Sequence, residues 1–167
     1  YYNKVLELDP NDSRAYTNLA YIKNDMGEYD SALMEVNKSI RINDKDLNLY
    51  LLRGTINMEI KNFDDAMFDF DRVISDGKRL NKLNFYYEGL YNKSLVKLLL
   101  GNYKEGWNLY ENRFFIEKHQ KFEKFKQKEI FGKIIKNKIP YLDKIDNLRD
   151  SNILIFCEQG IGEHVIF

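Results

Sequence analysis

The sequence is poor in the residues that build disulfides, metal sites and rigid turns. Its 167 residues include one cysteine, two prolines and two histidines. A single cysteine, Cys157, cannot form an internal disulfide, so a reducing compartment, most simply the cytoplasm, is the expected location. Because His119, His164 and Cys157 lie far apart in the chain without the spacing of metal ligands, no metal site is expected.

Long hydrophobic runs and an excess of one charge are also lacking. No apolar run approaches the ~20 residues that a membrane-spanning helix requires, so neither a membrane span nor a signal peptide is expected. The formal net charge is +0, but residues 1–76 carry 15 acidic and 9 basic side chains, whereas residues 113–138 carry 3 acidic and 9 basic ones. Two solvated helical faces of opposite charge account for this distribution.

A pattern that occurs twice at a constant spacing dominates the first half of the sequence. Each copy has an aromatic residue, a small residue four positions later and an alanine at the start of its second half. Small residues at these places allow two antiparallel helices to approach closely. The matched pairs are Tyr16 and Tyr50, Ala20 and Gly54, Gly27 and Lys61, Tyr29 and Phe63, Ala32 and Ala66, Val36 and Phe70, and Ser39 and Val73. With its period of about 34 residues, this pattern resembles the tetratricopeptide repeat, which implies an α-solenoid.

We therefore expect a tetratricopeptide-like array over residues 1–114. The predicted units are a partial one at 1–12 and full ones at 13–46, 47–80 and 87–114. The partial unit implies a parent protein that extends further toward the N-terminus. Six extra residues precede the last unit.

The predicted units also carry three local expectations. Residues 76–78 should end a helix, so that residues 81–86 lengthen a loop or the front of the next helix. Asp69 is expected on the outer face. Gly106 replaces the alanine of the last unit, and the expected fillers of the space beside it are Trp107, Tyr110 and Phe114.

The remainder of the chain changes character twice. Residues 115–150 place phenylalanines and isoleucines among lysines at helical spacing, which predicts basic connector helices. Such a stretch could also bind nucleic acid, but the near absence of arginine argues against a nucleic-acid partner. In residues 151–167 a short apolar run precedes a glycine-containing turn, which predicts the first βα unit of a truncated α/β domain.

Two stretches add a second, narrower resemblance. Residues 99–114, with Gly106 followed by Trp107, and residues 153–167 are similar to the junction in bacterial proteins that join tetratricopeptide repeats to a glycosyltransferase-like domain. The relatives are heptosyltransferases and, more distantly, O-linked N-acetylglucosamine transferases. The resemblance implies that a longer parent protein uses a sugar-nucleotide donor. For this fragment alone it implies neither a cofactor nor catalytic turnover.

The same resemblance assigns candidate catalytic residues in the parent enzyme. Gly160 and Gly162, the candidate cofactor-binding residues, would belong to the glycine-rich loop that faces the interdomain cleft, and Glu163 or His164 would act as the base toward the acceptor hydroxyl. The alternative is that both are ordinary residues in the first turn of a helix, where glutamate is favoured by the helix dipole.

In arrays of this family the first helix of each unit lines a concave groove. The predicted groove residues are Arg14, Thr17, Asn18, Tyr21, Asn24, Asn48, Leu51, Thr55, Met58, Glu88, Tyr91, Asn92 and Leu95. The expected partner is a protein or peptide segment bound in extended form through amide hydrogen bonds and an apolar pocket. The alternative is that the groove presents an acceptor to an active glycosyltransferase.

Overall fold

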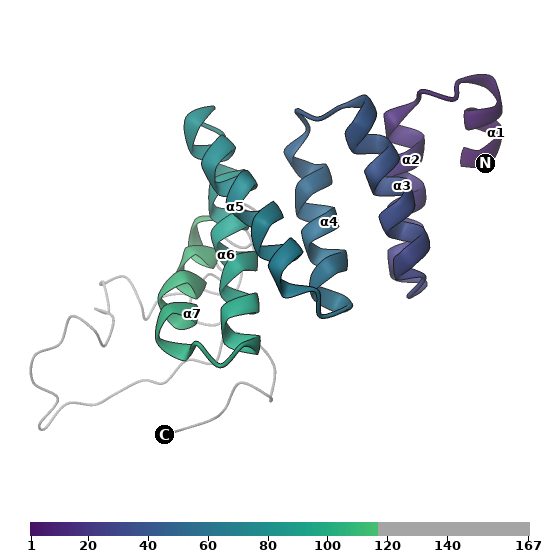
Figure 1. The fold of residues 1–167 in the computed structure, drawn as a ribbon. Helices are drawn as coiled ribbons and strands as arrows, with labels where there is room; N and C mark the ends of the chain where they lie inside the picture. The colour runs from purple at the N-terminus through teal and green to yellow at the C-terminus, as the bar shows by residue number, and fades with distance from the viewer. Residues whose placement is uncertain (117–167) are drawn as a thin grey trace, which may run out of the picture. The chain divides into compact units, whose positions relative to one another are not determined.

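The computed structural model describes residues 1–116 of the chain. Within these residues all regular structure is helical and none is a strand (Figure 1). This confirms the all-α prediction for the repeat region. The predicted connector beyond residue 116 and the predicted α/β start at 151–167 lie outside the described residues.

The described chain forms α-helices that pair as hairpins. Helix α2 pairs with α3, α4 with α5 and α6 with α7, while α1 packs against α2 and α3 packs against α4. The short 3-10 helix η1 follows α7 and contacts α6. The bounds are Tyr2–Leu8 for α1, Ser13–Asp25 for α2, Tyr29–Ile42 for α3, Leu47–Glu59 for α4, Phe63–Arg79 for α5, Leu83–Leu99 for α6, Tyr103–Tyr110 for α7 and Glu111–Phe115 for η1.

Equivalent residues begin and end the helices. The carboxylate of Asp12 accepts hydrogen bonds from the backbone N–H groups of Arg14 and Ala15 at 2.8 and 3.1 Å, and Asp46 caps α4 in a similar way. The turn within each hairpin then needs one residue in the left-handed region, which glycine adopts without strain. These turn residues are Gly27 with φ 76°, Lys61 with φ 63° and Gly101 with φ 77°.

Two clusters of buried side chains form the core, and α4 contributes to both. The first cluster contains Ala20, Ala32, Val36, Leu49, Leu52 and Ile56, from α2, α3 and α4. The second contains Ala66, Phe70 and Val96, with Leu51 and Met58 of α4 packed against it. Ala20, Ala32 and Ala66 are fully buried, as their positions in the repeat predict. A Cβ at Gly54 would lie 2.6 Å from the Phe70 ring, so the small residue there permits close packing of α4 on α5.

The connection from α5 to α6 agrees with one of the two expected alternatives, because residues 83–86 form the front of α6, while α5 continues to Arg79, one residue beyond the expected end at 76–78. Helix α5 has 17 residues where α3 has 14, and α6 has 17 where α4 has 13. The six extra residues therefore extend both helices. Gly77 lies inside α5, and a Cβ on it would be 2.8 Å from the backbone nitrogen of Tyr86. The glycine thus permits a close approach of two helices, whereas we had expected it to stop one.

The space beside Gly106 is filled by a different residue from those expected. A Cβ at Gly106 would lie 2.6 Å from Cδ2 of Leu98, and its three nearest atoms all belong to Leu98. The Trp107 side chain is instead 56% exposed and contacts the edge of the Tyr110 ring, with 5.4 Å between ring centroids. The expectation that Trp107 fills this space was therefore wrong.

Candidate functional site

The predicted groove residues all lie on α2, α4 and α6. On each helix most of them are three or four positions apart, which places these on one side of it, while Asn18 and Asn92 directly follow Thr17 and Tyr91. Helix α2 contacts α4, and α4 contacts α6. Burial raises the pKa of the Tyr21 phenol, and the carboxylates of Asp46 and Glu88 raise it further. The electrostatic field at Tyr21 on α2 therefore includes charges at the start of α4 and on α6.

Several of these side chains are already engaged within the fold. The Thr17 hydroxyl donates to the Ser13 carbonyl at 2.8 Å and shares a hydrogen bond with the Ser39 hydroxyl, so it lies between α2 and α3. Thr55 donates to the carbonyl of Leu51, and Asn92 donates to the carbonyl of Glu88. Leu51 and Met58 pack against the second core cluster, and Tyr91 contacts the Tyr110 ring.

Other groove residues keep polar groups that a partner could bind. Arg14 and Tyr21 are exposed, and Asn48 is exposed although its amide also donates to Asp46. The side-chain oxygen of Asn24 is buried and has no hydrogen-bond partner among the described residues. Asn18 and Leu95 are partly buried. The accessible polar groups of this set thus gather on α2 and at the start of α4.

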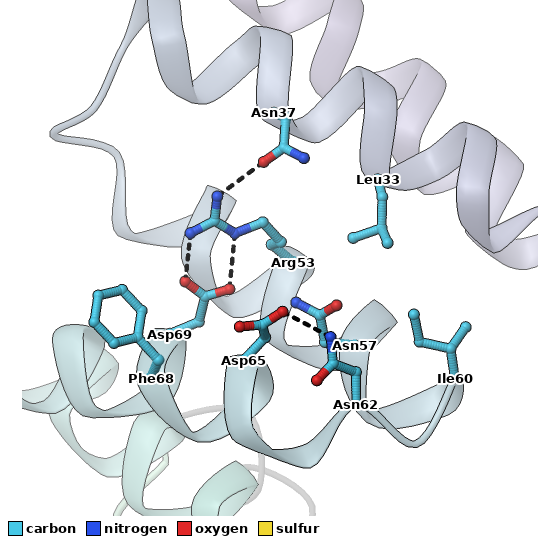
Figure 2. A pocket seen from close by; sticks show the side chains of 9 residues that line it. All are labelled: Leu33, Asn37, Arg53, Asn57, Ile60, Asn62, Asp65, Phe68 and Asp69. Carbon is cyan, nitrogen blue, oxygen red and sulfur yellow. Dashed lines mark hydrogen bonds and ion pairs between the residues drawn. The ribbon is translucent and has the colours of Figure 1, made fainter.

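A pocket of about 330 Å³ lies between α3, α4 and α5 (Figure 2). Sequence reasoning did not locate it. Its α4 residues lie on the opposite side of that helix from the groove residues Leu51 and Thr55, because successive residues of an α-helix are rotated by about 100°. The lining residues are Leu33, Asn37, Arg53, Asn57, Ile60, Asn62, Asp65, Phe68 and Asp69.

Arg53 connects the three helices around this pocket. Its Nε and Nη2 atoms donate to the two oxygens of Asp69 at 2.8 and 2.7 Å, and its Nη1 donates to the side-chain oxygen of Asn37 at 2.8 Å (Figure 2). The hydrogen bonds to Asp69 raise the pKa of the Arg53 guanidinium against the opposing effect of burial. Asp69 is 1% exposed. The expectation that Asp69 lies on the outer face was therefore wrong.

The internal repeat contains a signal for this arrangement. Glu35 and Asp69 occupy the same position in successive units, and both are buried carboxylates that pair with a cation on the first helix of their hairpin. In the first hairpin the partner is Lys23, whose Nζ is 2.7 Å from Glu35 Oε1. An acidic residue at the same repeat position, directly before a buried apolar one, could have indicated a structural ion pair.

The residues proposed for catalysis and cofactor binding, Gly160, Gly162, Glu163 and His164, lie outside the described residues. Over residues 1–116, the histidine, cysteine and acidic side chains form no group of three or more that could hold a metal ion. None of the helices described is both long enough and apolar enough to cross a membrane.

The chain is similar to known proteins in sequence and in fold. Residues 1–34 match the sequence model of the tetratricopeptide repeat family. Among solved structures, the chain is similar to that titled "Crystal structure of MamA", with 23% sequence identity and a TM-score of 0.58. The similarity covers 70% of this chain and 65% of the MamA chain, and at this identity it shows the fold alone. No curated protein sequence matches the chain.

Proposed function

We propose that this chain is a protein-interaction module that binds a segment of a partner protein on the face formed by α2, α4 and α6. The observation that carries the proposal is the tetratricopeptide match, together with an architecture of successive helix pairs whose first helices contact one another. Repeats of this type expose an extended surface along the stacked helices and use it to bind other chains.

The polar groups that remain available suggest how a segment is held. Tyr21 offers a partly exposed phenol and Asn48 an exposed side-chain amide, and these can donate hydrogen bonds to an extended backbone and accept hydrogen bonds from it. Thr17, Thr55 and Asn92 contribute less, because their side chains already bond within the fold.

A matched pair of triple variants tests this surface. Replacing Tyr21, Asn24 and Asn48 by alanine should remove the partners that the intact chain captures from extracts of its source cells, with little change in the thermal unfolding midpoint. The control triple replaces Tyr103, Asn43 and Asn108, which are exposed and lie outside the groove set. An unaltered set of captured partners in the first triple, or equal losses in both, would refute the proposal.

The narrower hypothesis of a glycosyltransferase parent rests on the resemblance of residues 99–114 and 153–167. Neither comparison concerns a glycosyltransferase. The coding sequence beyond Phe167 tests the hypothesis directly, because a glycosyltransferase requires further alternating strands and helices. A stop codon or another repeat there would refute the hypothesis.

The single cysteine of the sequence, Cys157, supports a separate proposal, that the protein lies in a reducing compartment such as the cytoplasm.

A further inference from the structure

The pocket between α3, α4 and α5 combines a carboxylate without an ion-pair partner, an unpaired amide and apolar walls. We propose that it binds the side chain of an arginine residue presented by a protein partner, with Asp65, Asn57 and Phe68 as its main contacts. The site is independent of the proposed groove, because the two surfaces use opposite sides of α4. Both could be occupied at the same time.

The charge in the pocket favours a cation. Arg53 and Asp69 neutralise each other through two short hydrogen bonds. Asp65 accepts a hydrogen bond from the Asn62 amide at 2.6 Å, but no cationic side chain forms an ion pair with it among residues 1–116. The residues that line the pocket therefore carry one net negative charge, and the Asp65 carboxylate also interacts electrostatically with the Arg53 guanidinium. An incoming guanidinium would form a charge-assisted hydrogen bond with this carboxylate.

Asn57 supplies a second, independent reason to expect a ligand. It is 5% exposed and lines the pocket, yet its side-chain amide forms no hydrogen bond with the residues that the structure describes. Figure 2 shows this side chain in the middle of the pocket, between the labelled residues of α3 and those of α5. Among the described residues the buried side-chain atom without a partner is Asn24 Oδ1, so the amide atoms of Asn57 are open to the space of the pocket, where a ligand can reach them. A ligand that donates N–H groups would satisfy the carbonyl oxygen of Asn57.

The walls select a long side chain over a small ion. Phe68 is 68% exposed, and Ile60 and Leu33 present further apolar surface. The aliphatic stem of an arginine can pack on such surface, while its planar guanidinium stacks on an aromatic ring and donates in several directions at once. A volume of about 330 Å³ is at the lower end of the ~300 to 1,000 Å³ typical of ligand pockets, so it suits one side chain and its adjoining backbone.

A blocked peptide, acetyl-Gly-Ala-Arg-Ala-Gly-amide, is a suitable probe. Titrated into the isotope-labelled 167-residue chain, it should cause saturable NMR shifts of the Asn57 side-chain amide and of the backbone at residues 65–69. Asp65→Asn should weaken binding by about fivefold or more, as expected for loss of one ionic contact. Asp64→Asn is the matched control, because it removes the same charge from the same helical turn at an exposed position outside the pocket.

Each alternative outcome would overturn the proposal. Equal weakening by Asp64→Asn and Asp65→Asn would show general attraction to an acidic surface. Equal binding of a peptide with citrulline in place of arginine would show that the pocket does not recognise the charge. Tighter binding of a peptide with lysine in place of arginine would show that the pocket does not recognise the guanidinium group. Phe68→Ala provides a second test, because this side chain is 68% exposed and belongs to neither core cluster, and it should also weaken binding.

Discussion

At the scale of single residues, Arg53 shows how a polar side chain can take the place of an apolar one in a repeat. Leu19 holds the same position in the preceding unit. Arg53 bonds at the same time to Asn37 on α3 and Asp69 on α5, so it links one hairpin to the next. Lys93, at the equivalent position of the following unit, repeats the link by pairing with Asp71 of α5 at 2.7 Å. Cations at equivalent positions therefore connect neighbouring hairpins.

Removing Asp69 should be strongly destabilising. Asp69→Ala leaves the guanidinium of Arg53, which is 23% exposed, without its counter-charge, and we expect a loss of about 2 to 4 kcal/mol in the free energy of unfolding. Asp71→Ala removes an exposed carboxylate from the same helix and should cost no more than about 1 kcal/mol. Urea denaturation of both variants measures the difference. Similar losses would mean that the buried pair is energetically equivalent to a surface one.

Glu35 should make the stability of the chain depend on pH. Burial alone would raise the pKa of its carboxyl, but hydrogen bonds from Lys23 and Lys38 outweigh burial and lower the pKa below the ordinary value of 4.5. A carboxyl with a lowered pKa in the folded state stabilises the fold above its unfolded pKa, and this contribution is lost as the pH falls through the folded pKa. The free energy of unfolding should therefore decline as the pH drops below about 4.5.

Glu35→Gln should reduce this decline, because glutamine does not titrate. Urea denaturation at a series of pH values between neutral and acidic measures the slope. Glu59→Gln is the matched control, since Glu59 is exposed and forms no ion pair among the described residues. If the two variants had the same slope, the pairing of Glu35 with its lysines would not govern the acid sensitivity.

At the scale of elements, the two longest helices, α5 and α6, pack closely because two glycines let their backbones meet. A Cβ at Gly77 would lie 2.8 Å from the Tyr86 nitrogen, and one at Gly89 would lie 2.8 Å from Cγ1 of Ile74 and 3.3 Å from the Phe70 carbonyl oxygen. At both positions backbone of the facing helix lies close to the glycine. Additional turns of helix can thus pack against each other without separating the hairpins.

Gly77→Ala therefore distinguishes between a glycine that ends a helix and one that permits contact. Alanine gains about 1 kcal/mol in helix propensity, so the change would stabilise an uncrowded helix. Overpacking against the backbone of α6 costs about 1 to 3 kcal/mol, and we expect a net loss of about 1 kcal/mol. Ser75→Ala, at an exposed position of the same helix, should change stability by less than about 0.5 kcal/mol. A gain in stability for Gly77→Ala in thermal or urea unfolding would contradict the close approach.

These elements show what the sequence could and could not predict. The internal period placed the small core residues correctly, because Ala20, Ala32 and Ala66 must be buried wherever two such helices meet. It did not decide whether six inserted residues form loop or helix, since glycine permits both outcomes. For the site, the period assigned the predicted groove residues to the first helix of each unit, and these residues lie on α2, α4 and α6. It could not show that Thr17 faces α3, because that depends on packing within the hairpin.

The pocket was beyond the reach of sequence reasoning for a related reason. Its residues come from three helices, and their convergence depends on how one hairpin packs on the next. The available signal was Asp69 at the same repeat position as Glu35, since it lies three positions after the buried Ala66 and next to the buried Phe70. Charged residues are rarely buried, and this general tendency outweighed the local pattern in the sequence interpretation.

At the scale of the whole described array, stability should be distributed over two linked cores. The first cluster joins α2, α3 and α4, the second joins α4, α5 and α6, and only α4 contributes side chains to both. In arrays of this kind each unit contacts its neighbours alone, so stability is approximately a sum of local terms. A defect in the first cluster should therefore weaken one end more than the other.

Ala32→Leu and Ala66→Leu test this distribution. Each inserts a large side chain at a fully buried alanine and should cost about 1 to 3 kcal/mol by overpacking. In hydrogen-exchange mass spectrometry, Ala32→Leu should reduce protection of α2 and α3 while α6 and α7 remain protected, because no residue of the last hairpin belongs to its cluster. Ala66→Leu should reduce protection of α4, α5 and α6 together. A uniform loss across all helices in both variants would mean that the described residues unfold as one cooperative unit, in which α4 transmits every defect from one core to the other.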